Sequence, residues 1–377
     1  MNKDLIFLLP SPPDPRIMKR VSTFIKNNYN LGLIYWNRFD WNYGIDDIRI
    51  DNVSYGRPFQ NNSFLIRLFK YIPYFYFCLK NIRKYNPKLI YAANIDMLNI
   101  AVVYKILFNK DIKIIYEVAD LGKRMISYYS VFLKNLEKCL LNWVDLLILT
   151  SSGFWDIYFN KIFTKEKLLI IENCPSKDIF KEFERKQKND DFVIGLIGFV
   201  RFAEQIFFLM DTTKNMKNVK IFIAGGGPDL DVVKQKAKIY SNVEVFGKYA
   251  YEDIASLYSK IDCIYSVFDK NWKGGKFALT NRLYDAILCD LPIIVAKDSL
   301  LSYYVNKYKI GFAVNSNSRE ELIKAINLLK KDSKYIDIIK KNCDVIKENF
   351  IWENMETKLY KGINKLIEIR NEKRKLK

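Results

Sequence analysis

The sequence contains no histidine among its 377 residues. Histidine is the side chain that most often acts as a general base near neutral pH, and its neutral imidazole is a common zinc ligand. Its absence excludes catalytic arrangements of the Ser-His-Asp or Cys-His type, and it removes the usual ligand of a zinc site. Any chemistry carried out by this chain must therefore use other groups.

Paired cysteines and long apolar segments are also missing. The six cysteines form no CxxC pair, and the first apolar run, residues 5–9, is too short for a signal peptide. We therefore expect reduced thiols and a cytoplasmic location. The most membrane-like segment, residues 64–80, contains Lys70 and Pro73, so it does not predict a membrane span. It fits either an amphipathic core helix or a helix that lies on the inner face of the cytoplasmic membrane.

Hydrophobic residues make up 50% of the chain and aromatic residues 15%, which argues against disorder and supports sizeable cores. The length exceeds what one core usually serves, so we expect two domains. Lys and Arg exceed Asp and Glu by 19, and a field of this sign attracts phosphorylated substrates and acidic lipid headgroups. Because no nucleic-acid-binding module is recognisable, we expect no nucleic-acid partner.

Short apolar runs alternate with amphipathic stretches, a pattern typical of parallel sheets covered by helices on both faces. The predicted strands occupy residues 4–10, 30–36, 88–93, 112–118, 145–150 and 167–173, then 192–200, 219–226, 243–247, 263–268, 292–296 and 311–314. The charged segment 176–191 separates the two sets and is the predicted linker. We therefore predict an α/β protein with two doubly wound, Rossmann-like domains, residues 1–180 and 181–350. A C-terminal helix and basic tail, residues 351–377, follow them, and ligands are expected at the carboxyl ends of the strands.

The most informative segment is a predicted helix and strand at residues 279–296. Asn281, Arg282 and Asp285 fall in the first turns of that helix. A helix N-terminus offers unpaired amides and partial positive charge, so together with Arg282 it would suit a diphosphate, while Asp285 would accept hydrogen bonds from ribose hydroxyls. The alternative is a surface ion pair beside a helix cap, which is common and weak.

Glycines follow two strands of the second half. Gly198 permits close approach of the backbone to phosphate, and Arg201 just beyond it would bind phosphate oxygens, although Gly198 also fits a simple turn. The run Gly225 to Gly227 matches neither a dinucleotide fingerprint nor a P-loop, so a tight turn between strand and helix explains it equally well.

In the first half, the strand at residues 112–118 ends in acidic side chains, Glu117 and Asp120, which we expect at the edge of the sheet. Asp120 would orient an acceptor hydroxyl, and a helix-capping Asp is the alternative. The loop at residues 10–20 brings Arg16 to the same edge, where it would contact the acceptor or close over the donor. A proline-rich connection to the first helix explains this loop equally well.

Taken in order, these motifs resemble the family 4 glycosyltransferases of the GT-B fold, especially bacterial members that build capsule or lipopolysaccharide. The resemblance covers nearly the whole chain. It is carried by the segments DPRIMKR (14–20), IYWNR (34–38), IIYEVADL (114–121), IGFVR (197–201), IAGGGP (223–228) and NRLYDAILCDLPIIV (281–295).

The resemblance implies transfer from a nucleotide-sugar donor, most often UDP- or GDP-linked, with retained anomeric configuration and with neither a cofactor nor a required metal. Arg201 and Arg282 match basic residues at the donor diphosphate, with Gly198 and Asn281 beside them. Asp285 stands where the family usually has the Glu that holds the ribose. The C-terminal helix is expected to pack back on the first domain.

Two positions depart from the family pattern. A second family Glu, near the donor sugar, is replaced by Phe277, and Lys276 beside it is a substitute candidate. A family His is replaced by Ala119, next to Asp120. In a front-face retaining transfer the leaving phosphate can itself take the acceptor proton, so this loss need not abolish activity.

We therefore predict a glycosyltransferase that acts on a polysaccharide or lipid-linked acceptor, with Asp120, Arg201 and Arg282 at the reaction centre. Two alternatives stay open at this stage. One is a nucleotide-sugar epimerase of the same fold. The other is a degenerate, non-catalytic GT-B binding subunit, an alternative based on Phe277 and Ala119 at positions where the family has polar residues.

Overall fold

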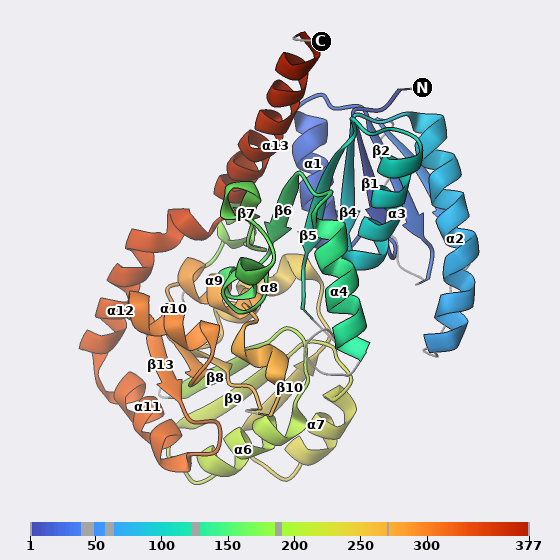
Figure 1. Cartoon of the computed structure of the whole chain (residues 1–377). Helices are drawn as coiled ribbons and strands as arrows, with labels where there is room; N and C mark the ends of the chain where they lie inside the picture. The colour runs from blue at the N-terminus through green and yellow to red at the C-terminus, as the bar shows by residue number, and fades with distance from the viewer. Residues whose placement is uncertain are drawn as a thin grey trace. The chain divides into compact units, whose positions relative to one another are not determined.

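The structure is a computed structural model that describes residues 2–38, 49–56, 64–121, 129–184, 191–269 and 271–375. It divides into two compact units (Figure 1). The first combines Met1–Asn173 with Glu356–Lys377, and the second is Cys174–Met355. Each unit contains one parallel sheet with helices on both faces, which is the α/β architecture predicted from the strand pattern.

The sheet of the first unit has the order β3-β2-β1-β4-β5-β6-β7, and its pairings are parallel. Its strands are β1 Leu5–Leu9, β2 Leu31–Trp36, β3 Ile50–Tyr55, β4 Leu89–Ala93, β5 Lys113–Val118, β6 Leu146–Leu149 and β7 Leu168–Ile170. The central strands are buried along their whole length, as expected where helices cover both faces. The chain reverses its direction across the sheet between β1 and β4, which creates a topological switch point there.

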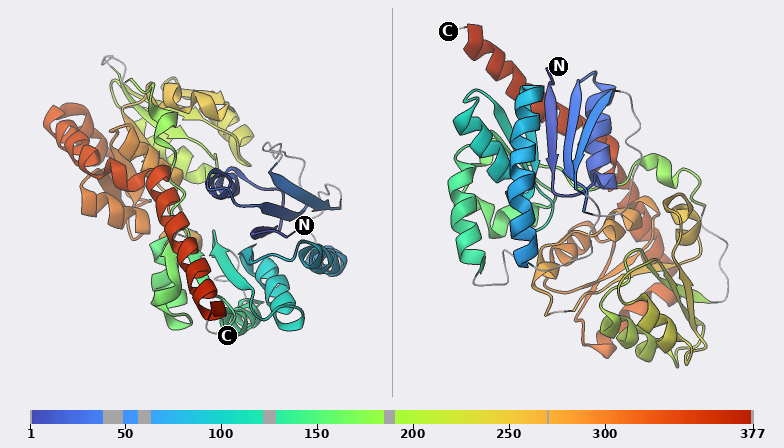
Figure 2. Two further views of the ribbon diagram at one scale, coloured as in Figure 1. Left: turned by 90° about the horizontal axis from the view of Figure 1, so that it is seen from above. Right: turned by 90° about the vertical axis from the view of Figure 1, so that its right-hand side faces the viewer.

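The helices of the first unit are α1 Pro15–Lys26, α2 Phe64–Tyr85, α3 Asn94–Leu107, α4 Tyr129–Leu141 and α5 Ser152–Ile157, with short 3-10 turns η2 Phe159–Lys161 and η3 Lys165–Lys167. In Figure 2, α1 lies on one face of the sheet and α2 and α3 lie on the other. The start of α1 is fixed by Asp14, whose side chain accepts a hydrogen bond from the Ile17 amide, and by Pro15 at the first helical position. None of the described helices is both long and apolar enough to cross a membrane.

The second unit has the sheet order β10-β9-β8-β11-β12-β13. Its strands are β8 Phe192–Ile197, β9 Val219–Ala224, β10 Val243–Gly247, β11 Cys263–Ser266, β12 Ile293–Ala296 and β13 Gly311–Val314. Here the direction reverses between β8 and β11, which pair side by side with Cys263 opposite Ile194. The carboxyl ends of these two strands therefore mark the expected ligand position in this unit.

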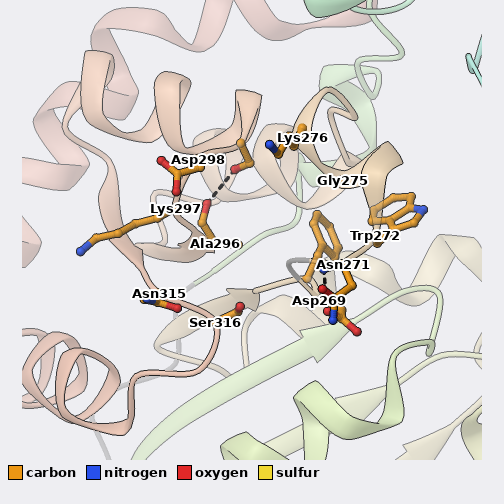
Figure 3. Close-up of a pocket in the computed structure, with 12 residues that line it drawn as sticks. Asp269, Asn271, Trp272, Gly275, Lys276, Ala296, Lys297, Asp298, Asn315 and Ser316 are labelled. Carbon is orange, nitrogen blue, oxygen red and sulfur yellow. Dashed lines mark hydrogen bonds between the residues drawn. The ribbon is translucent and has the colours of Figure 1, made fainter. Parts of the chain in front are cut away.

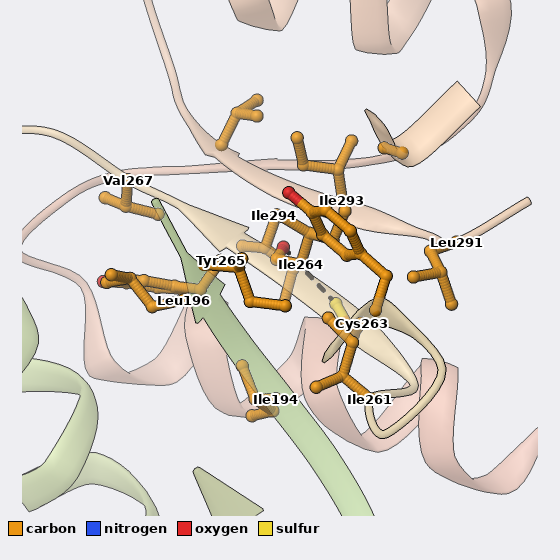
Figure 4. Close-up of a cluster of buried hydrophobic side chains, with 14 of the residues drawn as sticks. Ile194, Leu196, Ile261, Cys263, Ile264, Tyr265, Val267, Leu291, Ile293 and Ile294 are labelled. Atoms are coloured by element: carbon orange, nitrogen blue, oxygen red, sulfur yellow. Dashed lines mark hydrogen bonds between the residues drawn. The ribbon is translucent and has the colours of Figure 1, made fainter. Parts of the chain in front are cut away.

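Helices and short 3-10 turns fill the connections of the second unit. They are η4 Lys177–Phe180, α6 Ala203–Thr213, α7 Leu230–Ala237, η5 Tyr251–Asp253, α8 Ile254–Tyr258, η6 Lys273–Lys276, α9 Asn281–Leu288, α10 Leu300–Tyr308, α11 Arg319–Lys331, α12 Ser333–Ile346 and η7 Lys347–Phe350. Figure 4 shows the core around β8, β11 and β12, where Ile194, Ile264 and Ile293 are fully buried. This packed centre holds the strand ends, and the loops that follow them, in fixed positions.

The last helix, α13 Trp352–Lys375, belongs to both units, since the division falls between Met355 and Glu356. From Glu356 onward the helix is bound to the first unit. Lys26 forms an ion pair with Glu356 (3.2 Å), and the Tyr29 hydroxyl donates to the Asn364 side chain (2.5 Å). The expectation that the C-terminal helix packs on the first domain is confirmed.

All twelve predicted strands are present, and one strand was not predicted. This is β3, an edge strand in which only Ile50 is buried and polar residues interrupt the apolar ones, so it lacks the apolar run by which the others were recognised. The predicted linker also differs from the structure. Its first part forms η4, and Phe180 is buried in the core of the second unit, which already begins at Cys174. Residues 185–190 of that segment lie outside the described residues.

Candidate functional site

A pocket of about 360 Å³ lies at the carboxyl end of β8, at the switch point of the second unit. It is called the β8–α9 pocket below. Its lining includes the predicted site residues Gly198, Arg201, Asn281, Arg282 and Asp285. Residues from two segments about 80 positions apart in the sequence are therefore brought around one cavity.

The turn between β8 and α6 depends on unusual backbone conformations. Gly198 has φ of 113°, a region that favours glycine, and its amide donates to the Ala224 carbonyl (2.9 Å). Phe202 takes a left-handed conformation with φ of 65° just before α6. The Asp229 carboxylate accepts from the first amide of α6, that of Ala203 (2.9 Å). This contact caps the helix from the neighbouring loop.

The second glycine run supports this turn. A Cβ atom on Gly225 would lie 1.7 Å from the carbonyl oxygen of Gly198, so a side chain there would collide with the backbone of the first loop. The amide of Val200 donates to the Gly226 carbonyl (2.9 Å), which continues the pairing of β8 and β9 beyond the strands. None of the three glycines is among the residues that line the β8–α9 pocket. Gly225 and Gly227 allow the close packing of the two loops, since a Cβ atom on either would collide with the backbone of Gly198 or Val200.

Arg201 rests against aromatic rings at the pocket wall. Its guanidinium carbon lies 4.2 Å from the ring centroid of Trp272, 4.8 Å from that of Phe202 and 5.9 Å from that of Phe199. Each cation–π contact of this kind stabilises by roughly 0.5–2 kcal/mol. The rings therefore hold the charged group in place while it faces the pocket.

Arg282 is fixed by backbone oxygens instead. Its Nε donates to the Ile197 carbonyl (2.8 Å) and one terminal nitrogen donates to the Phe199 carbonyl (3.1 Å). These two bonds tie the first turn of α9 to the loop that contains Gly198. The alternative of a surface ion pair with Asp285 does not describe this geometry, because the hydrogen bonds of Arg282 go to the main chain.

The electrostatics of the pocket favour an anion. Burial lowers the pKa of Arg282, and the positive charge of Arg201 lowers it further. The two guanidinium groups are therefore close enough to repel each other, and a bound anion would relieve that repulsion. The N-terminus of α9, where Asn281 is the first helical residue, adds backbone amides and partial positive charge.

Asp285 is 4% exposed and lies one turn into α9, on the wall of the pocket. The Tyr258 hydroxyl donates to its Oδ2 atom (2.8 Å), which orients the carboxylate. Burial, together with the negative charge of Asp285, raises the pKa of Tyr258 well above its usual value. Tyr258 therefore stays a hydrogen-bond donor at neutral pH.

Two tyrosines complete the pocket and were not predicted. Tyr249 and Tyr251 follow β10 and line the same cavity as Asp285. Burial and then the charge of Asp285 raise the pKa of Tyr249 to about 12, against the opposing charge of Arg282. Both rings offer flat apolar surface beside hydroxyl groups. The spacing of two aromatic residues directly after a strand, KYAY, is the signal in the sequence that would have indicated them.

In the first unit the predicted acidic edge is only partly correct. Asp120 is exposed just after β5, but Glu117 is 1% exposed and points into the protein. Its carboxylate contacts Arg16 (2.5 Å), Arg20 (3.3 Å) and the Tyr91 hydroxyl (2.6 Å). Burial would raise the pKa of Glu117, but the two arginines outweigh it and hold the pKa below its usual value.

This cluster also corrects the expectation for Arg16. Its side chain is 15% exposed and is bound to Glu117 inside the unit, because the strand alternation turns Glu117 inward toward α1. The role of Arg16 as a contact to the acceptor is therefore not supported by its geometry. The catalytic role of Asp120 stays a prediction.

Comparison with known proteins adds a family match. Residues 177–350, nearly the whole second unit, match the family described as Glycosyl transferases group 1. The chain is a glycosyltransferase. A curated relative, the succinoglycan biosynthesis protein ExoL of Rhizobium meliloti (strain 1021), is 22% identical over 344 residues, with 84% of this chain and 82% of that protein covered.

Solved structures share the architecture of this glycosyltransferase. Sucrose-phosphate synthase from Thermosynechococcus elongatus superimposes with a TM-score of 0.75 at 14% identity, covering 97% of this chain and 100% of that one. HepE from Anabaena in complex with UDP gives a TM-score of 0.72 at 16% identity, with 96% and 100% covered. At these identities the likeness establishes the fold, which is GT-B as predicted.

Proposed function

We propose that the chain is a family 4 glycosyltransferase that moves a sugar from a UDP- or GDP-linked donor to a polysaccharide or lipid-linked acceptor in bacterial surface polysaccharide synthesis. The observation that carries this proposal is the convergence of Arg201, Arg282 and the start of α9 on one pocket that also contains two tyrosines and a buried carboxylate. Such a pocket combines groups suited to phosphates, to a ribose and to a flat base.

Each part of the donor has a matching group. The diphosphate would bind Arg201, Arg282 and the first amides of α9, since guanidinium groups and helix N-termini favour phosphate oxygens. The ribose hydroxyls would donate to Asp285, which Tyr258 already orients. The base would lie against Tyr249 and Tyr251, which line the same pocket.

The proposed reaction keeps the anomeric configuration. The bond between the anomeric carbon and the diphosphate oxygen breaks, and the acceptor oxygen bonds to that carbon from the same face. The acceptor proton passes to the leaving diphosphate, so the step balances without a histidine. The chain contributes positioning and stabilisation of the growing negative charge by Arg201 and Arg282. Asp120 orients the acceptor hydroxyl.

Two relatives support the choice of substrate class. ExoL is named as a succinoglycan biosynthesis protein, and the HepE structure contains UDP. Further HepE structures contain UDP-glucose or UDP with glucose. A polysaccharide acceptor and a nucleotide-sugar donor are therefore the substrates that we assign to this chain.

The test is a comparison of UDP, GDP, ADP and CMP by thermal denaturation and calorimetry. We expect one of UDP or GDP to raise the melting temperature, because a ligand that binds only the folded state stabilises it. The matching nucleotide sugar is then incubated with and without oligosaccharide acceptors. Absence of binding to every nucleotide would contradict the proposal, and so would release of an epimerised donor in the absence of acceptor.

We also propose that α2 mediates peripheral contact with an anionic membrane, on the cytoplasmic side. One stripe of the helix is core, with Tyr74, Cys78 and Ile82 fully buried. A second stripe is exposed, with Phe69 at 74%, Ile72 at 52% and Tyr76 at 67%. The helix has basic residues and no Asp or Glu, so aromatic and cationic groups occur together, as in helices that lie at lipid interfaces.

Vesicle flotation tests this contact. Vesicles containing phosphatidylglycerol are expected to carry the wild-type protein, and vesicles of phosphatidylcholine alone are expected to carry less of it. Replacing Phe69 and Tyr76 by Ser should reduce flotation severalfold. Phe132→Ser, which removes an exposed aromatic residue from α4, is the matched control and should float like wild type. Equal flotation of all three proteins would remove α2 from the proposal.

A further inference from the structure

The strand β13, Gly311–Val314, is the last strand at one edge of the second sheet, where β12 is its neighbour. The Lys297 amide at the end of β12 donates to the Val314 carbonyl (2.8 Å), so the even-numbered residues of β13 turn their backbone groups toward β12. In a parallel ladder, alternate residues direct these groups to opposite sides. Gly311 and Ala313 therefore turn their amide and carbonyl groups to the open side of the sheet, and both residues are partly exposed.

Side chains close both ends of this open edge. The Lys309 carbonyl accepts from the side-chain amide of Asn342 (3.0 Å), and the Asn315 amide donates to the Glu321 carboxylate (2.8 Å). Lys309 and Asn315 are odd-numbered, like the two residues between them, which agrees with the outward direction of the backbone groups there. A row of outward amide and carbonyl groups is a template for the pairing of another strand.

A groove of about 330 Å³ lies at the same edge, between β13 and α11, which are neighbours in Figure 1. It is called the β13–α11 groove below. The residues of α11 that line it follow the spacing of one helix stripe, and they are Glu321, Lys324, Ala325 and Leu328. Lys297 lines it as well, and Figure 3 shows its side chain extending away from Trp272 and Lys276. Its ammonium group pairs with Glu321 (2.8 Å).

The helix α11 carries opposite charges at its two ends. Glu320 and Glu321 lie in its first turn, and Lys330 and Lys331 lie in its last turn. Glu320 and Lys331 are exposed and about three helical turns apart, so they lie on the same flank of the helix, beside the stripe that lines the groove. When two copies of a helix pack antiparallel, each acidic end lies against the basic end of the other copy.

We infer that this edge of the second unit binds a second copy of the chain across a two-fold axis, with the two β13 strands antiparallel. In the register that centres on Phe312, Gly311 of each copy faces Ala313 of the other, and each such pair exchanges both of its hydrogen bonds. The outward groups of both residues are then used, and the two sheets become one continuous sheet. The partly exposed Phe312 meets its counterpart at the axis as an aromatic cross-strand pair.

A second copy fits this surface better than an unrelated strand does. A lone strand would pair with β13, but it would leave the charged ends of α11 without opposite charges. In the two-fold pair, Glu320 of each copy faces Lys331 of the other, so the same contact forms twice. The pairing also uses up the open edge and leaves none for a third copy. The expected product is therefore a closed dimer and not a filament.

The experiment compares the full wild-type chain with two charge reversals, Glu320→Lys and Lys331→Glu, and with an equal mixture of these two variants. Analytical ultracentrifugation and light scattering measure the mass over a range of concentrations. The matched control is Lys238→Glu, which reverses an exposed lysine at the end of α7. In each reversal variant, like charges face each other twice across the axis. In a heterodimer of the two variants, opposite charges face each other at both contacts.

We expect wild type and the control to form a reversible dimer in the micromolar range, because the net charge of +19 on each copy opposes association. Each reversal should weaken dimerisation about tenfold or more, since like charges across an interface repel. The mixture should dimerise like wild type. UDP affinity should be the same for all of these proteins, because neither α11 nor α7 lines the β8–α9 pocket.

A second variant tests the strand pairing separately. Ala313→Pro removes an outward amide and leaves the pairing with β12 intact, since proline is tolerated where the amide faces outward at a sheet edge. The dimer should be lost while the melting temperature stays close to that of wild type. This variant also keeps the test decisive if a charge reversal lowers the melting temperature.

A wild type that stays monomeric throughout would overturn the inference and leave the edge to a strand of another protein. Reversal variants or an Ala313→Pro variant that dimerise like wild type would overturn it as well, and so would a mixture of folded reversal variants that stays monomeric. Failure of the proposed function looks different, because in that case no nucleotide binds, whatever the mass of the protein in solution.

Discussion

The two units share one architecture, but the arginines near the ends of their strands contact different kinds of groups. In the second unit, Arg201 lies on aromatic rings and Arg282 donates to main-chain carbonyls, and both line a pocket. In the first unit, Arg16 and Arg20 surround the buried carboxylate of Glu117. Contacts with aromatic rings and carbonyl oxygens do not neutralise a guanidinium group, so it can still attract an anionic ligand. A guanidinium group that is paired with a carboxylate inside the protein attracts an anion much less.

This difference suggests that the arginines of the second unit serve ligand binding and those of the first unit serve the stability of the fold. The positive charge of Arg201 lowers the pKa of Arg282, so a bound anion would stabilise both cations of the second unit. The cluster of the first unit is buried and places two arginines against one carboxylate, so removal of that carboxylate leaves buried positive charge uncompensated. We therefore expect substitutions in the two places to affect different measurements.

The largest expected effect is on the stability of the first unit. Glu117→Gln removes the buried carboxylate that Arg16 and Arg20 share, and loss of one partner of a buried pair destabilises by about 3–5 kcal/mol. The free energy of unfolding is measured by urea denaturation, and UDP affinity by calorimetry should be unchanged in the folded variant. Asp111→Asn, at an exposed carboxylate just before β5, is the control and should change stability by about 0.5 kcal/mol at most. If both substitutions lowered the free energy of unfolding equally, the buried cluster would not be what stabilises the first unit.

The next effect is on ligand binding in the second unit. Arg201→Ala removes a charged donor from the proposed diphosphate site, and such hydrogen bonds contribute about 1.5–3 kcal/mol, or roughly 10–100-fold in affinity. Calorimetric titration with UDP measures this loss in the folded variant. The melting temperature without ligand should also fall, because the cation–π contacts with Trp272 and Phe202 are lost together with the charge. Arg201→Lys should recover part of the affinity, since it keeps the charge but not the planar fork. Unchanged affinity of the Ala variant would remove Arg201 from the site.

A smaller effect should follow from the packing of the two glycine loops. Gly225→Ala places a methyl group against the Gly198 carbonyl at a φ of 145°, and strain of this kind costs about 1–3 kcal/mol. Both the melting temperature and UDP affinity should fall, because the displaced loop contains Gly198 and Arg201. Gly226→Ala is the matched control, since its Cβ would meet only the flexible Lys248 side chain at 3.3 Å. Identical behaviour of the two variants would contradict the packing argument.

The smallest expected effect is on the pH dependence of stability, which tests the buried cluster of the first unit separately from the pocket of the second. The pKa of Glu117 is lowered in the folded state from its usual value of 4.5, so its stabilising contribution is present above that value. The contribution is lost as the pH falls through the folded-state pKa. The stability difference between wild type and Glu117→Gln should therefore be constant near neutral pH and shrink only below about pH 4. A difference that already shrank between pH 7 and 6 would point to another group.

Much of the fold could be predicted because most of the parallel strands in the described residues are short apolar runs, as in β1, β4 and β6. The exception, β3, lies at a sheet edge and mixes polar with apolar residues. The grouping of Gly198, Arg201, Asn281, Arg282 and Asp285 around one pocket could also be predicted, because the ends of parallel strands meet at the same edge.

The partners of these residues could not be predicted. Nothing in the spacing shows that Arg282 bonds to the Ile197 carbonyl or that Arg201 lies on Trp272, since both contacts depend on how distant loops pack. The inward direction of Glu117 was missed for a related reason. An acidic residue near the end of a strand suggests an exposed sheet edge. Only the positions of Arg16 and Arg20 on α1 show that buried cations can pair with its carboxylate.

The division of the chain has a consequence for its synthesis. The second unit is enclosed by the first in sequence, and its two ends are joined where the Trp352 amide donates to the Pro175 carbonyl (2.8 Å). All residues of the second unit are synthesised before Glu356, so its sequence is complete before the segment that completes the first unit is made. The first unit must wait with the α1 surface uncovered until the last helix has emerged, and that interval is when a growing chain would most need a chaperone.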